Sequence, residues 1–239
     1  MNYNPIIIVA GEPNSIFIEI FLKSIKKNKF KSQIILIASL NLLRLQMKKL
    51  NYNFDINILN LNNYKKTNLS KKKINLFDVK YETKKAFNKT TKKSKSYISN
   101  SFELALKLLK LNISKKLING PISKKHFLEG KYPGVTEYLS RKTNTKKYAM
   151  LIYNKKLSVC PITTHMPLKL VSKKISKKTI IEKINLINEF YKTTFDKKPN
   201  IAVTGLNPHC ESFDYYNEDV KIIKPVISHL IKLRVKISG

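Results

Sequence analysis

The stretch Pro5-Ile6-Ile7-Ile8-Val9-Ala10, followed by the turn Gly11-Glu12-Pro13, decides the fold that the sequence predicts. A short apolar run that ends in Gly and Pro is typical of a buried strand entering a tight turn. Residues 16–25 then follow a helical pattern, and Ile34–Ala38 forms a second apolar run. Strand, helix and strand at this spacing predict a parallel βαβ unit.

The same alternation continues along the chain. Residues 65–95 carry 12 lysines against two acids, and we expect them to form an irregular or hairpin-bearing surface excursion. We expect a helix at 100–111, capped by Asn100 or Ser101, a long helix at 180–191, capped by Ser176, and a final helix at 218–233. The expected strands are 116–119, 148–153, 158–163 and 201–204. This order favours a mainly parallel sheet with helices on both faces.

Composition limits the class of protein. The chain has 239 residues, enough for one α/β domain or two small ones, and a net charge of +32. Only three of the 47 basic residues are Arg (Arg44, Arg141 and Arg234), whereas nucleic-acid sites rely on Arg for bidentate contacts. The lysines are spread along the chain, and Asn and Ile are also abundant, so an AT-rich genome explains the charge better than nucleic-acid binding. A basic nucleic-acid-binding protein remains the third hypothesis.

Neither export nor a membrane span is indicated by the sequence. No apolar stretch approaches the roughly 20 residues of a membrane span, and the run at Pro5–Ala10 is too short for a signal-peptide core. The two cysteines, Cys160 and Cys210, do not form a CxxC pattern, and we expect two free thiols. We therefore expect a cytoplasmic protein with no membrane partner.

Two histidines directly follow predicted strands. His165 ends Ile162-Thr163-Thr164-His165, and His209 ends Thr204-Gly205-Leu206-Asn207-Pro208-His209. In open α/β sheets, ligands collect beyond the carboxyl ends of the strands. Either histidine alone suits a hydrogen-bonded loop residue, but two in equivalent positions also suit a pair of metal ligands, because imidazole is a common metal ligand.

Two further turns offer polar groups. Gly120-Pro121-Ile122-Ser123-Lys124 could receive a phosphate on backbone N–H groups and the Lys124 ammonium, although a lysine after a turn is expected anywhere in this chain. Gly134-Val135-Thr136-Glu137 offers a hydroxyl and a carboxylate at the start of a helix, where plain helix capping is the alternative.

Taken together, these segments resemble the 4-hydroxythreonine-4-phosphate dehydrogenase family of pyridoxal phosphate biosynthesis, the PdxA family. The resemblance runs in order across nearly the whole chain. Its specific motifs are Thr163-Thr164-His165-Met166-Pro167-Leu168 and Gly205-Leu206-Asn207-Pro208-His209. The weaker ones are the segments beginning at Gly11, Asn119 and Gly134.

The resemblance implies an isocitrate/isopropylmalate-dehydrogenase-like α/β/α fold with a mainly parallel sheet and two lobes, 1–118 and 119–239. It implies a homodimer with the active site at the subunit interface. The implied reaction is the oxidation of 4-phosphohydroxy-L-threonine by NAD or NADP, followed by decarboxylation and assisted by one divalent metal ion (Zn, Mg or Co). His165 and His209 would bind the metal, and Thr136, with Lys124, the substrate. No catalytic or cofactor-binding residue is assigned.

This chain also departs from the family pattern. Val135 stands where the family has a substrate-binding His, and Ser15 and Phe17 replace two glycines after the first turn. The family's sequence continues past the point that matches Gly239 and there carries its third metal histidine and the strands that complete the first lobe. His126 and His229 are expected to be surface residues rather than substitutes. The second hypothesis is therefore a shortened, catalytically impaired relic, or a non-catalytic phosphate-ligand-binding protein of the same fold.

Overall fold

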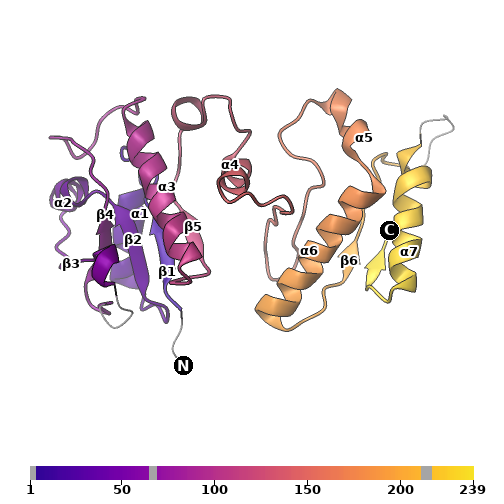
Figure 1. The fold of residues 1–239 in the computed structure, drawn as a ribbon, viewed down its shortest axis with the longest axis horizontal. Helices are drawn as coiled ribbons and strands as arrows, with labels where there is room; N and C mark the ends of the chain where they lie inside the picture. The colour runs from indigo at the N-terminus through magenta and orange to yellow at the C-terminus, as the bar shows by residue number, and fades with distance from the viewer. Residues whose placement is uncertain (1–3, 65–68, 211–216) are drawn as a thin grey trace. The chain divides into compact units, whose positions relative to one another are not determined.

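The chain folds into two compact units, Met1–Tyr132 and Pro133–Gly239, in a computed structural model that describes residues 4–64, 69–210 and 217–239 (Figure 1). The sequence placed the division of the two lobes after residue 118. That point falls inside strand β5 (Leu117–Asn119), which pairs with β1 (Ile6–Val9) in the sheet of the first unit. Residues 119–132 therefore belong with the first unit.

The first unit is built on a five-stranded sheet in the order β3-β4-β2-β1-β5. The remaining strands are β2 (Ile34–Ala38), β3 (Ile56–Ile58) and β4 (Ile74–Asp78). Every pairing is parallel, with Ile7 opposite Ile35 in one pair and Leu36 opposite Leu76 in another. The parallel βαβ unit predicted from the first residues of the chain is thus confirmed.

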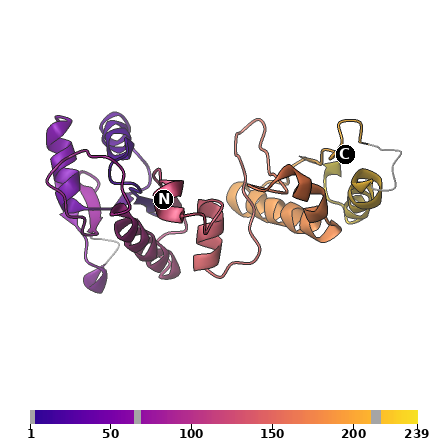
Figure 2. The same cartoon turned by 90° about the horizontal axis from the view of Figure 1, so that it is seen from above.

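Helices cover both faces of this sheet. Helices α1 (Phe17–Lys27) and α2 (Leu40–Lys49) pack on the face that carries Ile8, Leu36 and Leu76. Helix α3 (Ser94–Lys110) contacts β1 and β2 and buries Ile98, Phe102 and Leu108. Since side chains alternate between the two faces of a strand, α3 takes the other face, and Figure 2 shows it across the strands from α1 and α2. The result is the expected α/β/α arrangement.

The lysine-rich stretch 65–95 contains a core strand, which corrects the sequence-based expectation. Its residues Ile74 and Leu76 are buried in β4, between β2 and β3. The strand was hidden because it is only five residues long, contains the polar residues Asn75 and Asp78, and has lysines before and after it. Helix α3 likewise starts at Ser94 rather than near residue 100, so Ser101 lies inside the helix and donates to the Tyr97 carbonyl (2.8 Å) instead of capping it.

The second unit has a small core of its own. Helix α6 (Lys177–Phe195) buries Ile180 and Ile184 against Val226 and Leu230 of α7 (Lys224–Lys232), and the two helices lie side by side in Figure 1. The other regular elements described in the unit are α4 (Val135–Lys142), the 3-10 helix η4 (Leu168–Leu170), α5 (Val171–Lys174), β6 (Ile201–Ala202), the π-helical turn η5 (Asp219–Ile223) and β7 (Ile237–Ser238).

Two expected strands of the second unit, 148–153 and 158–163, do not form. Only Ile152 and Val159 pair, in a single antiparallel bridge, and both side chains are more than half exposed. An apolar pattern without a neighbouring strand to bond to does not produce a sheet. Among the described residues, no helix has both the length and the apolar character needed to cross a membrane.

Candidate active site

Two of the motifs singled out in the sequence meet in the second unit. Helix α4 starts after Gly134, so Thr136 and Glu137 lie in its first turn. The Glu137 Oε1 atom accepts a hydrogen bond from the Thr164 hydroxyl (3.1 Å), in the residue before His165. This hydrogen bond joins the first turn of α4 to the loop that carries Thr164, 27 residues further along the chain. Glu137 therefore does more than cap its own helix.

The second oxygen of the Glu137 carboxylate lies beside His165. A Cβ atom at position 134 would be 2.9 Å from Glu137 Oε2 and 3.4 Å from His165 Nε2, so the absence of a side chain at Gly134 leaves room for both. Glu137 Oε2 is buried and has no hydrogen-bond partner. The residues at this point thus include an imidazole nitrogen and an unsatisfied carboxylate oxygen, both of which can bind a divalent metal ion.

A cavity of about 310 Å³ opens next to this pair. Thr136, Glu137 and Thr164 line it, together with Lys174 and Lys183, which supply positive charge. The Lys183 ammonium donates to the Tyr148 carbonyl (2.5 Å) and lies over the Tyr148 ring. The cavity therefore combines hydroxyl, carboxylate and ammonium groups, as a site for a small anionic substrate would.

Lys183 also acts on Cys160, near the same cavity. Burial raises the pKa of the Cys160 thiol above its ordinary value, and the positive charge of Lys183 opposes that shift. Both Cys160 and Cys210 are free thiols, as the sequence indicated. A thiol whose pKa is raised is largely protonated at neutral pH, so Cys160 lacks the character of a reactive nucleophile.

His209 lies on a different turn, which is held by a buried carboxylate. The side chain of Asp219 is 4% exposed and accepts from the backbone N–H groups of Leu206 (2.8 Å) and Asn207 (3.1 Å). A Cβ atom at position 205 would lie 3.0 Å from Asp219 Oδ1, so Gly205 permits this approach. Asp219 was missed from the sequence because it lies ten residues beyond His209, and an acidic residue at the start of a helix suggests only local charge compensation.

His165 and His209 lie on different loops of the second unit. The described residues contain no group of three His, Cys, Asp or Glu side chains placed to hold a metal ion. The groups that suit a divalent ion are the Glu137 Oε2 atom, which has no hydrogen-bond partner, and the His165 imidazole beside Gly134. The residues present thus suit one side of a metal site.

The remaining sequence candidates lie in the first unit or make no polar contact. Lys124 begins the π-helical turn η3 (Lys124–Leu128), whose first residues are capped by the Ser123 hydroxyl, and its side chain is exposed. Val135, at the family's His position, is half-buried at the start of α4. His229 is exposed, as expected, but His126 is half-buried with its Nδ1 atom out of contact with solvent.

The glycines at the ends of β1 and β5 have a steric role. A Cβ atom at Gly11, which has φ +76°, would lie 2.4 Å from the Pro121 carbonyl oxygen, and one at Gly120 would lie 2.1 Å from the Ala10 oxygen. Only glycine fits where two backbones approach so closely. Although two family glycines are replaced nearby, the helix start survives, because the Ser15 hydroxyl accepts from the Phe17 N–H (3.3 Å).

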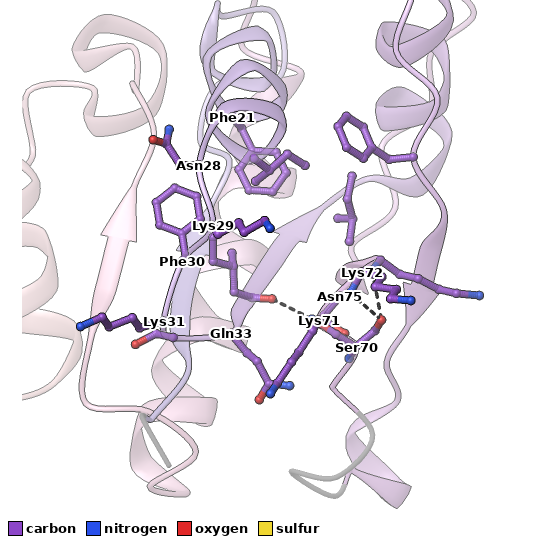
Figure 3. A pocket seen from close by; sticks show the side chains of 16 residues that line it. Phe21, Asn28, Lys29, Phe30, Lys31, Gln33, Ser70, Lys71, Lys72 and Asn75 are labelled. Carbon is purple, nitrogen blue, oxygen red and sulfur yellow. Dashed lines mark hydrogen bonds between the residues drawn. The ribbon is translucent and has the colours of Figure 1, made fainter. Parts of the chain in front are cut away.

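A larger cavity of about 540 Å³ lies at the opposite, amino ends of β2 and β4 (Figure 3). Its apolar floor includes Phe21, Phe30 and Phe54, and five lysines surround it: Lys29, Lys31, Lys71, Lys72 and Lys73. In parallel α/β sheets, ligands bind at the carboxyl ends of strands. The motifs shared with the PdxA family do not reach this cavity.

The three-layer parallel fold of the first unit defines an α/β protein of the dehydrogenase-like class. A solved structure of 4-hydroxythreonine-4-phosphate dehydrogenase from Klebsiella pneumoniae superimposes with a TM-score of 0.82 at 23% identity, covering 99% of this chain and 74% of that one. Residues 30–239 match the family model of the pyridoxal phosphate biosynthetic protein PdxA. The chain belongs to the PdxA family.

Two relatives show how the similarity is distributed. The 4-hydroxythreonine-4-phosphate dehydrogenase of Sulfurihydrogenibium sp. is 35% identical over 229 residues, which cover 93% of this chain and 69% of the relative. The D-threonate 4-phosphate dehydrogenase of Pectobacterium atrosepticum is 32% identical over 109 residues, which cover 45% of this chain and 33% of the relative.

Proposed function

We propose that the chain catalyses the NAD(P)-dependent, metal-assisted oxidation of 4-phosphohydroxy-L-threonine, with decarboxylation of the product. The observation that carries the proposal is the junction of the Gly134–Glu137 and Thr163–His165 motifs at one cavity that also contains two lysines. The relative that matches most of this chain carries the name of the same activity.

The residues of the cavity have separate tasks in this proposal. Lys174 and Lys183 attract the anionic substrate, and the Thr136 hydroxyl bonds to it and orients it. His165 and His209 would hold the divalent ion, which when bound would supply Lewis-acid activation of the substrate hydroxyl. A bound nicotinamide would supply the hydride acceptor, so the protein's own residues mainly provide orientation and charge stabilisation.

The proposed homodimer bears directly on the metal site. His165 follows Thr164 on one loop of the second unit, and His209 follows Pro208 on another. A site at an interface between two copies is an arrangement in which both can reach one ion. Lys124, from the first unit, is proposed as a further substrate contact, although it lies on a segment outside the cavity.

The test is NAD(P) reduction by the purified chain with 4-phosphohydroxy-L-threonine and added Zn²⁺, Mg²⁺ or Co²⁺. We expect turnover that His165→Ala and His209→Ala each reduce by at least about 100-fold, and that the exposed His229→Ala leaves unchanged. Turnover insensitive to both site variants would exclude the mechanism. Substrate binding without turnover would favour the alternative of a non-catalytic phosphate-ligand-binding protein.

D-threonate 4-phosphate is the second candidate substrate, because several relatives are named for its oxidation. It differs from the first substrate in carrying a hydroxyl in place of the amine. Comparison of kcat/KM for the two compounds decides between them, since this ratio measures the difference in transition-state binding. We expect 4-phosphohydroxy-L-threonine to give the higher value, in line with the longer match to its dehydrogenase.

A further inference from the structure

The cavity of about 540 Å³ at the amino ends of β2 and β4 has no part in the proposed function. It lies wholly within the first unit, whereas the residues of the proposed active-site cavity belong to the second. Its size suits a small organic molecule, since ligand pockets commonly measure about 300–1,000 Å³. The side chains around it indicate which class of molecule that would be.

Side-chain amides fix the two walls of this cavity to each other. The first wall is the loop 28–33 between α1 and β2, and the second is the segment 70–73 that leads into β4. Gln33 Nε2 donates to the Leu69 carbonyl (2.8 Å) across the two walls. The buried Asn75 amide donates to the carbonyls of Ile34 (3.1 Å) and Ser70 (2.9 Å). The cavity is therefore preformed, and a ligand would not have to order its walls on binding.

The floor of the cavity is aromatic and partly open. Phe21 is buried in the core of the unit, and the Phe54 ring stacks on Tyr52 with the ring centroids 6.0 Å apart. Phe30, in contrast, is 50% exposed. A half-exposed phenylalanine beside a cavity offers ring surface to a second ring, and aromatic pairs are stabilised beyond the area that they bury.

Lysine side chains at the cavity leave positive charge without a carboxylate to balance it. Lys73 has the Asp55 carboxylate 3.8 Å away, and Lys31 extends away from the cavity in Figure 3. Lys29, Lys71 and Lys72 form no ion pair within the described ranges of the chain. Figure 3 shows Lys29 extending from the first wall toward the second. An anionic group above the floor would receive charge-assisted hydrogen bonds from these ammonium groups.

We propose that this cavity binds an aromatic phosphate, with its ring against Phe30 and Phe54 and its phosphate on Lys29 and Lys72. Lysines alone would not support this inference, because a chain with 47 basic residues places lysines around any hollow. The inference rests on their combination with an open aromatic floor and with walls that are fixed in place. The substrate of the proposed reaction has no aromatic part, so the ligand is a different molecule, and the inference does not depend on the proposed function.

The experiment is calorimetric titration of the purified chain with 1-naphthyl phosphate. We expect Phe30→Ala and the double variant Lys29→Gln/Lys72→Gln each to weaken binding at least about fivefold. All three residues are exposed, so the fold should survive these substitutions. The matched controls are Phe87→Ala (38% exposed) and Lys107→Gln/Lys110→Gln on α3, which remove the same groups outside the cavity and should bind as the wild type does.

Two further phosphates test which part of the ligand is recognised. Octyl phosphate has an apolar body without a ring, and inorganic phosphate has no body, so both should bind more weakly than 1-naphthyl phosphate. Equal binding of either compound would overturn the aromatic assignment. Adenosine monophosphate distinguishes the sources of such a ligand: tighter binding than 1-naphthyl phosphate would support a nucleotide, and weaker binding a smaller aromatic phosphate.

The variants decide whether the cavity is the binding site. Losses as large in Lys107→Gln/Lys110→Gln as in Lys29→Gln/Lys72→Gln would show a general effect of charge and overturn the inference. Binding that Phe30→Ala leaves unchanged would overturn it as well. A wild-type chain that binds none of these phosphates would overturn the inference and leave the proposed function standing.

Discussion

At the scale of single residues, two acidic side chains are buried in the described part of the chain, Glu12 and Asp219. They differ in how well they are satisfied. Both Asp219 oxygens accept backbone N–H groups. Glu12 accepts from the Ser94 hydroxyl (2.9 Å) through one oxygen, whereas its Oε1 atom has no partner. The two residues should therefore respond in opposite ways when their charge is removed.

Replacing Glu12 with Gln should make the protein more stable than the wild type, by an amount that grows as the pH rises. Burial raises the pKa of Glu12 above its ordinary value of 4.5, more than the Ser94 hydrogen bond lowers it. The folded state thus holds its proton where the unfolded state releases it, so this residue lowers stability as the pH rises from about 4. We expect Glu12→Gln to gain stability over the wild type between about pH 4 and pH 7, as measured by urea unfolding.

Glu82→Gln is the control for this pH effect, because Glu82 is exposed and the substitution removes the same charge from the same unit. Its difference from the wild type should stay constant over the same range. A constant difference for Glu12→Gln as well would show that Glu12 has the same pKa in both states.

Replacing Asp219 should destabilise the second unit. In Asp219→Asn, an amide NH2 group faces a backbone N–H donor where an oxygen stood, and we expect a loss of about 1–3 kcal/mol in the free energy of unfolding. Asp196→Asn is the control, because Asp196 is exposed at the end of α6 with φ +53°, a conformation that Asn also adopts. Equal effects of the two substitutions, measured by denaturant titration, would contradict the anchoring role of Asp219.

At the scale of elements, the sequence predicts best where a short pattern is decisive. The βαβ unit at the start of the chain and helix α6 follow from apolar periodicity, and the Ser176 cap is confirmed by a bond from the Thr179 N–H (3.2 Å). Strand β4 escaped prediction because its place between β3 and β2 in the sheet depends on partners distant in sequence. Lysines before and after a short apolar run hide such a strand from any local pattern.

The Ser176 cap provides a test at this scale. Ser176→Ala removes the acceptor for an N–H group in the first turn of α6, and we expect a loss of about 1 kcal/mol in the free energy of unfolding. Ser172→Ala removes a hydroxyl from α5 that makes no capping bond, so its effect should stay within about 0.5 kcal/mol. A Ser176→Ala variant as stable as the wild type would mean that water replaces the hydroxyl at no cost.

At the scale of the whole molecule, the motifs identified the family, and the structure added what the motifs could not contain. The sequence singled out the Gly134 and His165 segments separately, but their junction depends on Glu137 reaching Thr164 across 27 residues. Lys183 became a candidate only because α6 places it at the cavity. In a chain with 47 basic residues, no sequence pattern distinguishes that lysine from the others.

The surface of the second unit bears on the expected homodimer. Large apolar side chains are unusually exposed there, among them Leu168 (88%), Leu157 (74%) and Ile152 (60%). Ile152 pairs with Val159, which is 52% exposed, so two exposed apolar side chains lie together at this bridge, and exposed apolar patches mark surfaces that bind other molecules. We predict that this unit forms the dimer contact, and that Ile152→Glu shifts the chain from dimer to monomer at micromolar concentration.

The matched control for that prediction is Ile20→Glu on helix α1, an exposed apolar residue of the first unit (49% exposed). Both variants add one negative charge to a strongly basic chain, so a general effect of charge would act on both. Sedimentation velocity should give twice the mass of one chain for the wild type and for Ile20→Glu, and the mass of one chain for Ile152→Glu. A monomeric wild type would contradict the expected dimer. Dissociation caused by Ile20→Glu alone would place the dimer contact on the first unit. If only the second-unit variant dissociates and also loses Co²⁺ binding, assembly of the metal site depends on pairing of two chains.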